Sequence, residues 1–273
     1  MKTLTSPQAR PLAPPPFSIS TNSKPGQQNR PLWRRGRHGL SSEVMQTFLL
    51  AGREVALDPE ALSSRLLLDP ASAEFAELLA LCRQAARAAR PRALYGPAYI
   101  EGRGDDWALI EGVKFESRVL AVNLAPVERA FPFIATMGME LERFGGGSRD
   151  PLEREALEAV KDLALLSALE AVNRHLAEQF GIRKSSMMNP GSIEDWPLSE
   201  QTSLFQLLGD PEARLGIKLL DSLMMSPSRT VSGLRFASEF DFESCLLCPR
   251  EACPARRAPY DPGLYRKRYA GKS

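Results

Sequence analysis

The sequence predicts an α+β domain that contains a mainly antiparallel, twisted sheet with flanking helices. Short runs rich in β-branched and aromatic residues lie within 99–138, and Gly-containing turns separate them. A long stretch with helical spacing follows at 151–179. Because strands and helices do not alternate regularly along the chain, these segments favour an antiparallel sheet over a parallel one.

Composition divides the 273 residues into three parts. Residues 1–40 are rich in Pro, Arg and polar side chains, which predicts a disordered tail. Residues 41–242 carry the regular patterns of the α+β domain. Residues 243–273 form a C-terminal tail that holds three of the four cysteines.

Charge and hydropathy exclude two classes of partner. The 35 basic and 33 acidic residues leave a net charge of +2, so no nucleic-acid partner is expected. No apolar run approaches the roughly 18–20 residues of a spanning helix, so no membrane partner is expected either. The basic cluster at 34–38 is not followed by the apolar region of a signal peptide, which favours a cytoplasmic location.

The spacing of apolar residues predicts the elements of the first half of the chain. Helices are expected at 42–52 and 71–90, where Ala and Leu recur every three or four positions. The segment 99–124 is expected to form strands, because β-branched and aromatic residues alternate there with Gly-containing turns.

In the second half, Asp150 and Pro151 give the helix at 151–179 a cap and a first-turn residue. Pro197 is expected to open another helix, and Val231–Phe236 reads as a strand. The residues of that helix expected to face inward are Leu198, Leu204, Phe205 and Leu208.

A Pro-Gly loop before Pro197 is the first candidate binding site. Gly191 allows close approach of a ligand to the backbone, Asp195 could accept an amino group, and Trp196 could cover an aromatic or cationic group. The alternative is a plain turn in which Asp195 caps a helix and Trp196 packs in the core, and local features alone favour it. The candidate ligand-binding residues of this loop are Asn189, Pro190, Gly191, Ser192, Asp195 and Trp196.

The segment 224–233 is the second candidate loop. Its hydroxyls and Arg229 offer hydrogen-bond donors, and Ser228 and Ser232 are the candidate ligand-binding residues. Its two methionines offer a soft apolar surface. The alternative is a polar hairpin connection beside core methionines.

Cys245, Cys248 and Cys253 form a C-x2-C-x4-C pattern, which favours a bound metal, either an iron–sulfur cluster or zinc. Three ligands are one short of a closed tetrahedral site. The fourth could be Cys82, solvent or a substrate atom. Free buried thiols or a redox pair are the alternatives.

Motifs of common catalytic classes are missing from the sequence. No P-loop, nucleophile elbow or G-x-G-x-x-G occurs, which disfavours nucleotide hydrolysis and Rossmann chemistry. His175 lies late in the long helix with no nucleophile signature nearby, so a solvated or capping role is expected. No catalytic residue is assigned.

The segment 189–236 resembles the reactivation domain of cobalamin-dependent methionine synthase, and in particular the free-standing activation-domain-like proteins of that family. A Pro-Gly loop, a helix that ends in Leu-Leu, a Gly-Ile-Lys-Leu stretch, a Pro-containing loop and a Val-Ser-Gly stretch occur in the family's order. Here these are Pro190-Gly191, Leu207-Leu208, Gly216–Leu219, Pro227 and Val231–Gly233.

The resemblance implies an activation-domain-like fold that binds S-adenosylmethionine and presents it to cobalamin on a partner protein. It places Glu170 at the position of an acidic residue that contacts the ligand. Three features depart from the family's pattern. The stretch Glu194-Asp195-Trp196 stands where the family has Ala-Cys-Pro. Met187 stands where an arginine holds the methionine carboxylate, and Ser192 stands where the family has a tyrosine.

Three functional hypotheses follow. The first is a reactivation protein, an accessory methyltransferase component for a methionine synthase that lacks this module, with flavodoxin or ferredoxin as electron donor. The second is an iron–sulfur reductive activator of a corrinoid methyltransferase. The third is a non-catalytic, zinc-stabilised module that binds a partner protein.

Overall fold

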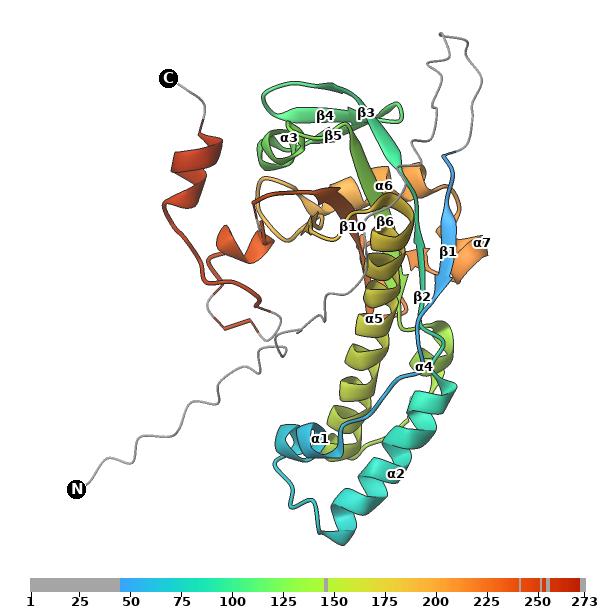
Figure 1. The fold of residues 1–273 in the computed structure, drawn as a ribbon. Coiled ribbons are helices and arrows are strands. Elements are labelled where there is room, and N and C mark those ends of the chain that lie inside the picture. Colours follow the sequence, from blue (N-terminus) through green and yellow to red (C-terminus); the bar gives the residue numbers. More distant parts are fainter. Residues whose placement is uncertain (1–44, 145–146, 241, 251, 254–255, 271–273) are drawn as a thin grey trace, which may run out of the picture.

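The computed structural model describes residues 45–144, 147–240, 242–250, 252–253 and 256–270, and the 1–40 tail predicted to be disordered lies outside them. Within the described residues, eight strands form one antiparallel sheet in the order β1-β2-β6-β3-β4-β5, with β10 between β6 and β7 (Figure 1). The predicted α+β fold class is confirmed. The strands are β1 (Phe48–Ala51), β2 (Arg92–Tyr95), β3 (Ala98–Arg103), β4 (Trp107–Ile110), β5 (Val113–Glu116), β6 (Arg129–Thr136), β7 (Ser185–Met188) and β10 (Thr230–Ala237), while β8 (Lys218–Leu219) and β9 (Met225–Ser226) form a separate ribbon.

Strand β6 is the centre of the sheet. It pairs along one edge with β10 and along the other with β2 and then β3. Seven of its eight residues are buried, because layers of helices and loops cover both faces of the sheet. The helices are α1 (Pro59–Leu66), α2 (Ala73–Ala88), α3 (Arg118–Leu124), α4 (Met139–Arg143), α5 (Pro151–Phe180), α6 (Gln201–Leu208) and α7 (Pro211–Leu215).

Helix α5 covers one face of the sheet. Side chains of alternate strand positions pack against its inner residues Ala168, Val172 and Leu176 in one apolar cluster. Asp150 caps its first turn, and Gly181 ends it in the left-handed conformation at φ 69°. The strand residues of this cluster are Ala93, Tyr95, Phe131, Phe133, Ala135 and Met187.

The opposite face packs against α3, α6 and α7. Side chains of neighbouring strand positions point to this opposite face. Among them, Leu94 and Ile134 contact buried leucines of α6 and α7. Met188 and Leu234 join the cluster that holds Trp196 and the α3 residues. The chain therefore places one layer on each side of β6.

The first half of α5 extends beyond the sheet (Figure 1). There it packs with α1, α2 and α4 in a separate helical cluster that contains the buried Cys82. At about 1.5 Å per residue, a 30-residue helix is long enough to join this cluster to the sheet.

Several sequence-based predictions are confirmed. The helix expected at 71–90 is α2, the helix expected at 151–179 is α5, and the strand expected at 231–236 is β10. The helix expected after Pro197 begins with a short 3-10 turn, Leu198–Glu200, and continues as α6.

Two element predictions are wrong. The described part of 42–52 contains strand β1, because Phe48–Ala51 pairs in register with Arg92–Tyr95 of β2. The end of 99–124 is helix α3, because the Ser117 hydroxyl accepts the Leu120 N–H at 3.0 Å and the helix buries its apolar side in the core.

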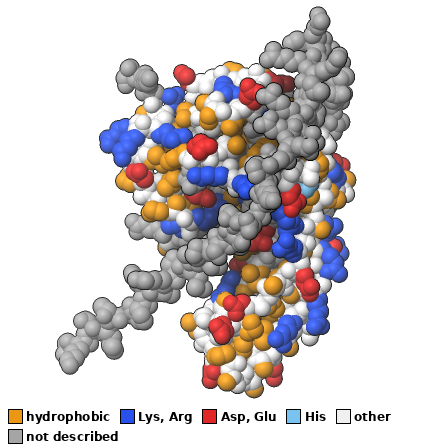
Figure 2. Space-filling model, in the orientation of Figure 1, with side chains coloured by type: hydrophobic (Ala, Val, Ile, Leu, Met, Phe, Trp, Pro, Cys, Tyr) orange, Lys and Arg blue, Asp and Glu red, His pale blue; other side chains and the backbone are white. Residues whose placement is uncertain are grey.

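The segment that follows β10 packs on the domain. Phe242 and Tyr269 are buried in the same cluster as Trp196, and the Tyr269 hydroxyl donates to Asn123 Oδ1 at 3.1 Å. Its exposed Arg266, Lys267 and Arg268 lie on a short helical turn. On the face that Figure 2 shows, basic and acidic side chains are interspersed. In the part of the chain that is described, no helix is both long and apolar enough to cross a membrane.

We expect Arg229 to anchor the start of β10 to α5. Its guanidinium lies 2.6 Å from Glu158 and 2.8 Å from Asp162. Arg229→Met should lower the free energy of unfolding by about 1 kcal/mol, because half-buried, shared pairs are worth more than exposed ones. Lys218→Met is the control, because it breaks a single exposed pair with Glu212.

Urea unfolding followed by circular dichroism measures both variants. The control should change stability by about 0–0.5 kcal/mol. Equal effects of the two substitutions would mean that the Arg229 pairs do not anchor the strand.

Candidate functional site

The Pro-Gly loop follows β7 directly and closes on itself through main-chain hydrogen bonds. The Gly191 N–H donates to the Trp196 carbonyl at 2.8 Å, and the Trp196 N–H donates to the Ile193 carbonyl at 3.2 Å. Gly191 has φ 76°, and a Cβ there would lie 3.1 Å from Leu198 Cδ1. The positive φ favours glycine, and a Cβ would also press on the Leu198 side chain.

This loop forms one wall of a hollow of about 380 Å³. The opposite wall comes from the cysteine segment, so Gly191 and Ser192 lie beside Cys248 although more than fifty residues separate them. The volume lies in the range of small-molecule sites, roughly 300–1,000 Å³. The lining residues are Gly191, Ser192, Ile193, Glu194, Pro197, Leu247, Cys248 and Pro249.

Asn189 and Ser232 do not line the hollow. Asn189 Nδ2 donates to the Ser232 carbonyl at 2.7 Å, and the Ser232 hydroxyl donates to Gln201 Oε1 at 2.9 Å. All three residues are buried, as is Pro190. Their polar groups fasten the loop to β10 and α6.

Asp195 and Trp196 hold neighbouring elements in place. Asp195 Oδ2 accepts the Val119 N–H at 2.8 Å and also the Ser117 hydroxyl, and both bonds lie at the start of α3. Trp196 is fully buried and meets Phe115 edge to face at 6.3 Å between ring centroids. These contacts match the alternative of a helix cap and a core tryptophan.

Ser228 and Glu170 lie away from this hollow. Ser228 is exposed, and its hydroxyl donates to Glu142 Oε2 of α4 at 2.9 Å. Glu170 is exposed on α5, which packs on one face of the sheet, while Trp196 packs on the other face. Neither residue lines the hollow.

The cysteine segment lies around a short helical turn, Ser244–Leu246. Cys245 Sγ accepts the Arg257 N–H at 3.4 Å, and Cys248 faces the hollow. Across the residues that the structure describes, no three His, Cys, Asp or Glu side chains are grouped in a way that could hold a metal ion. The predicted zinc or iron–sulfur site at Cys245, Cys248 and Cys253 therefore finds no support.

Cys82 does not serve as a fourth ligand of that pattern. It is buried in α2, within the helical cluster beyond the sheet, and its Sγ lies 3.6 Å from the Ala156 carbonyl. Burial raises the pKa of the Cys82 thiol to about 11, so the side chain is protonated at neutral pH.

His175 is half-buried and contacts the sheet instead of capping a helix. Its Nδ1 forms a hydrogen bond with the Tyr95 hydroxyl, and its ring packs edge to face on Phe48 at 4.9 Å. Burial raises the pKa of Tyr95 far above its ordinary value. The pair fastens α5 to β1 and β2.

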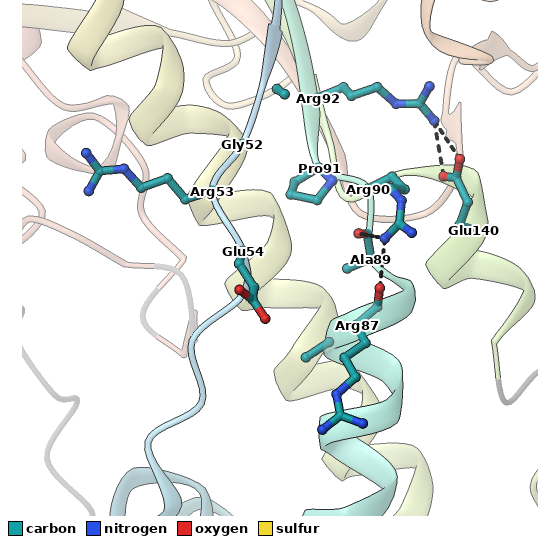
Figure 3. Close-up of a pocket in the computed structure, with 11 residues that line it drawn as sticks. Gly52, Arg53, Glu54, Arg87, Ala89, Arg90, Pro91, Arg92 and Glu140 are labelled. Carbon is teal, nitrogen blue, oxygen red and sulfur yellow. Dashed lines mark hydrogen bonds and ion pairs between the residues drawn. The ribbon is translucent and has the colours of Figure 1, made fainter.

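A second hollow, of about 460 Å³, lies between the end of β1, the end of α2 and the start of β2 (Figure 3). Four of its lining residues are arginines. Figure 3 shows the guanidinium groups of Arg53, Arg87 and Arg92 pointing in different directions, and Arg92 bonds Glu140 at 3.0 Å. These donors do not converge on one point, so the hollow offers no shared anion site.

Sequence reasoning missed two residues near the Pro-Gly loop. Glu194 is exposed and is the one acidic residue in the lining of the hollow. Arg235 is buried in β10 directly opposite Met187 of β7. A lone arginine within an apolar strand gives no sequence signal that separates it from a solvent-facing residue.

We expect Asp195→Ala to destabilise the fold, because it removes two hydrogen bonds at the start of α3. The loss should be about 1–2 kcal/mol, as for other capping side chains. Asp221→Ala, at an exposed aspartate without a described partner, should stay within about 0.5 kcal/mol. Chemical unfolding of both variants checks the contrast, which equal stabilities would contradict.

Three of the four thiols should react with a thiol reagent in the native protein at pH 8. Cys245, Cys248 and Cys253 are half-buried, whereas Cys82 is fully buried and its raised pKa leaves almost no thiolate. The fourth should react only after unfolding. A Cys82→Ala variant should lose that late reaction alone, and modification of all four thiols at one rate would contradict the assignment.

Comparison with known proteins found a solved structure with a similar fold. No family model and no curated protein sequence matches the chain. Among solved structures, the chain is similar to the crystal structure of the MetH reactivation domain bound to AdoHcy, with a TM-score of 0.50 and 14% sequence identity. The similarity covers 74% of this chain and 81% of that chain, and it shows that the two share a fold.

Proposed function

We propose that this chain is an S-adenosylmethionine-binding reactivation protein for a cobalamin-dependent methionine synthase. The observation that carries the proposal is the fold shared with the MetH reactivation domain, which was solved with AdoHcy bound. The Pro-Gly, Leu-Leu and Val-Ser-Gly stretches occur in an order that resembles the family's, which also supports the proposal.

The hollow at the Pro-Gly loop is the proposed ligand site. Its volume suits a nucleoside-sized molecule, and Gly191 brings the main chain to its surface without a side chain. Glu194 is an exposed lining residue, and its negative charge would attract the positive charge of a sulfonium group. Shape, main-chain groups and this charge together favour S-adenosylmethionine.

The proposed role is positioning rather than acid–base catalysis. S-adenosylmethionine carries an activated methyl group, and a reduced corrinoid on a partner protein would accept it once an electron donor such as flavodoxin or ferredoxin has supplied one electron. The product left on this chain would be AdoHcy. The chain therefore needs a site that orients the methyl group outward, and no catalytic triad.

Gly191→Ala should weaken S-adenosylmethionine binding at least about tenfold, which corresponds to roughly 1.4 kcal/mol. The added methyl group would press on Leu198 and displace the loop that lines the hollow. Gly181→Ala is the matched control, because it also has positive φ but its Cβ meets nothing within 4 Å. Isothermal titration calorimetry of both variants compares the affinities.

Each substitution should cost about 1 kcal/mol of stability for an alanine at positive φ, and Gly191→Ala should cost more because its Cβ also presses on Leu198. Only Gly191→Ala should change the affinity. Equal affinities in the two variants would place the ligand elsewhere.

The activity itself is tested by reconstitution. The purified chain should support methyl transfer from S-adenosylmethionine to the corrinoid of a methionine synthase that lacks a reactivation module, in the presence of a low-potential reductant. Methylated corrinoid is followed by its absorbance. No methylation above the level without the chain, together with no S-adenosylmethionine binding, would refute the proposal.

A further inference from the structure

A single turn joins Cys245 and Cys248. The Cys248 N–H donates to the Cys245 carbonyl at 3.3 Å, and Leu247 between them has φ −105° and ψ −2°, close to the third residue of a type I turn. The Cα atoms at the two ends of such a turn lie less than about 7 Å apart. A disulfide spans roughly 4.4–6.8 Å between Cα atoms, so the backbone already holds these two residues within bridging range.

The Arg256 guanidinium binds both ends of this turn. It donates to the Cys245 carbonyl at 3.2 Å and to the Cys248 carbonyl at 3.1 Å. Between the cysteines, Leu246 and Leu247 pack against the apolar core of the domain. These contacts fix the relative position of the two cysteines. Thiols that are held at a short, fixed separation react with each other as if each were present at high concentration.

Small reagents reach this pair from solvent. Both side chains are half-buried, and Cys248 lines the hollow of about 380 Å³ beside the Pro-Gly loop. Cys82 is fully buried in the helical cluster beyond the sheet, and Cys253 follows Cys248 by five residues, outside the turn. Cys245 and Cys248 are therefore the two thiols that the fold places together at an accessible surface.

We propose that Cys245 and Cys248 form a redox dithiol site that reacts with low-molecular-weight disulfides. The C-x2-C spacing is that of dithiol redox motifs as well as of metal sites. The inference goes beyond the proposed function, because neither the site nor its test involves S-adenosylmethionine.

The reaction is thiol–disulfide exchange in two steps. The Cys248 sulfur, as a thiolate, attacks one sulfur of a small disulfide RSSR, whose S–S bond breaks as RS⁻ leaves. The Cys245 thiolate then attacks the Cys248 sulfur in this mixed disulfide, and the second RS⁻ leaves. The two thiols give up two electrons and two protons in all, and RSSR becomes two RSH.

Oxidation changes the wall of the hollow. In the dithiol form, Cys248 lies in the lining between Leu247 and Pro249. In the disulfide form, its sulfur is bonded to Cys245 and no longer offers a thiol to the hollow. The hollow therefore has a reduced and an oxidised form.

The test is incubation of the reduced wild-type chain with oxidised glutathione at pH 8, followed by peptide mass mapping. Trypsin cleaves after Arg250, so Cys245 and Cys248 fall on peptide 236–250 and Cys253 falls on another. Peptide 236–250 should lose two hydrogen atoms, and dithiothreitol should restore them. Cys245→Ser and Cys248→Ser should each stop at a glutathione adduct on this peptide, whereas the matched control Cys253→Ser should form the bridge as the wild type does.

A second measurement separates the folded site from the spacing alone. The equilibrium constant for bridge formation against glutathione should be at least about tenfold larger in buffer than in urea, because the native turn holds the pair together. Arg256→Met should lose part of this advantage while its thiols still react with glutathione.

Three results would overturn the proposal. The first is glutathione adducts on both cysteines of peptide 236–250 with no bridge, or a bridge to Cys253. The second is an equal equilibrium constant in buffer and in urea. The third is thiols that stay unreactive until a chelator is added, which would identify a metal site. The wild-type measurements need no substitution, so they decide the matter even if a variant does not fold.

Discussion

The burial of β6 on both faces is the constraint on which the rest of the structure depends. Its apolar residues require a layer on each side of the sheet, and α5 supplies one while α3, α6 and α7 supply the other. The chain leaves α5 through β7 and must cross to the second layer. The Pro-Gly loop makes that crossing, so the candidate site lies where the two layers are joined.

Helices could be predicted from the sequence where capping residues and apolar spacing lie within the helix itself. Asp150 and Pro151 mark the start of α5, and Gly181 marks its end. The helical spacing of apolar residues predicted α2. Phe48–Ala51 could not be predicted in the same way, because its strand conformation comes from pairing with β2 more than forty residues away. Arg118–Leu124 contains β-branched residues that suggest a strand, but Ser117 and burial in the core stabilise a helix.

The candidate site was predictable only in part, for the same reason. Gly191 and Ser192 line the hollow, whereas Asn189 and Asp195 direct their polar groups to other parts of the protein. Polar residues beside a turn identify a loop that could bind a ligand. Which of its polar groups remain available depends on partners distant in sequence, and Ser232 and Val119 provide those partners here.

The segment that follows β10 forms one ordered wall of the hollow. Phe242 and Tyr269 anchor its two ends in the core, and between them Arg256 donates to the carbonyls of Cys245 and Cys248 at 3.2 and 3.1 Å. One guanidinium that ties several carbonyls fixes the shape of a turn that has little regular structure of its own. The cysteine spacing therefore accompanies a turn that Arg256 already holds, and the hollow depends on that turn as much as on the Pro-Gly loop.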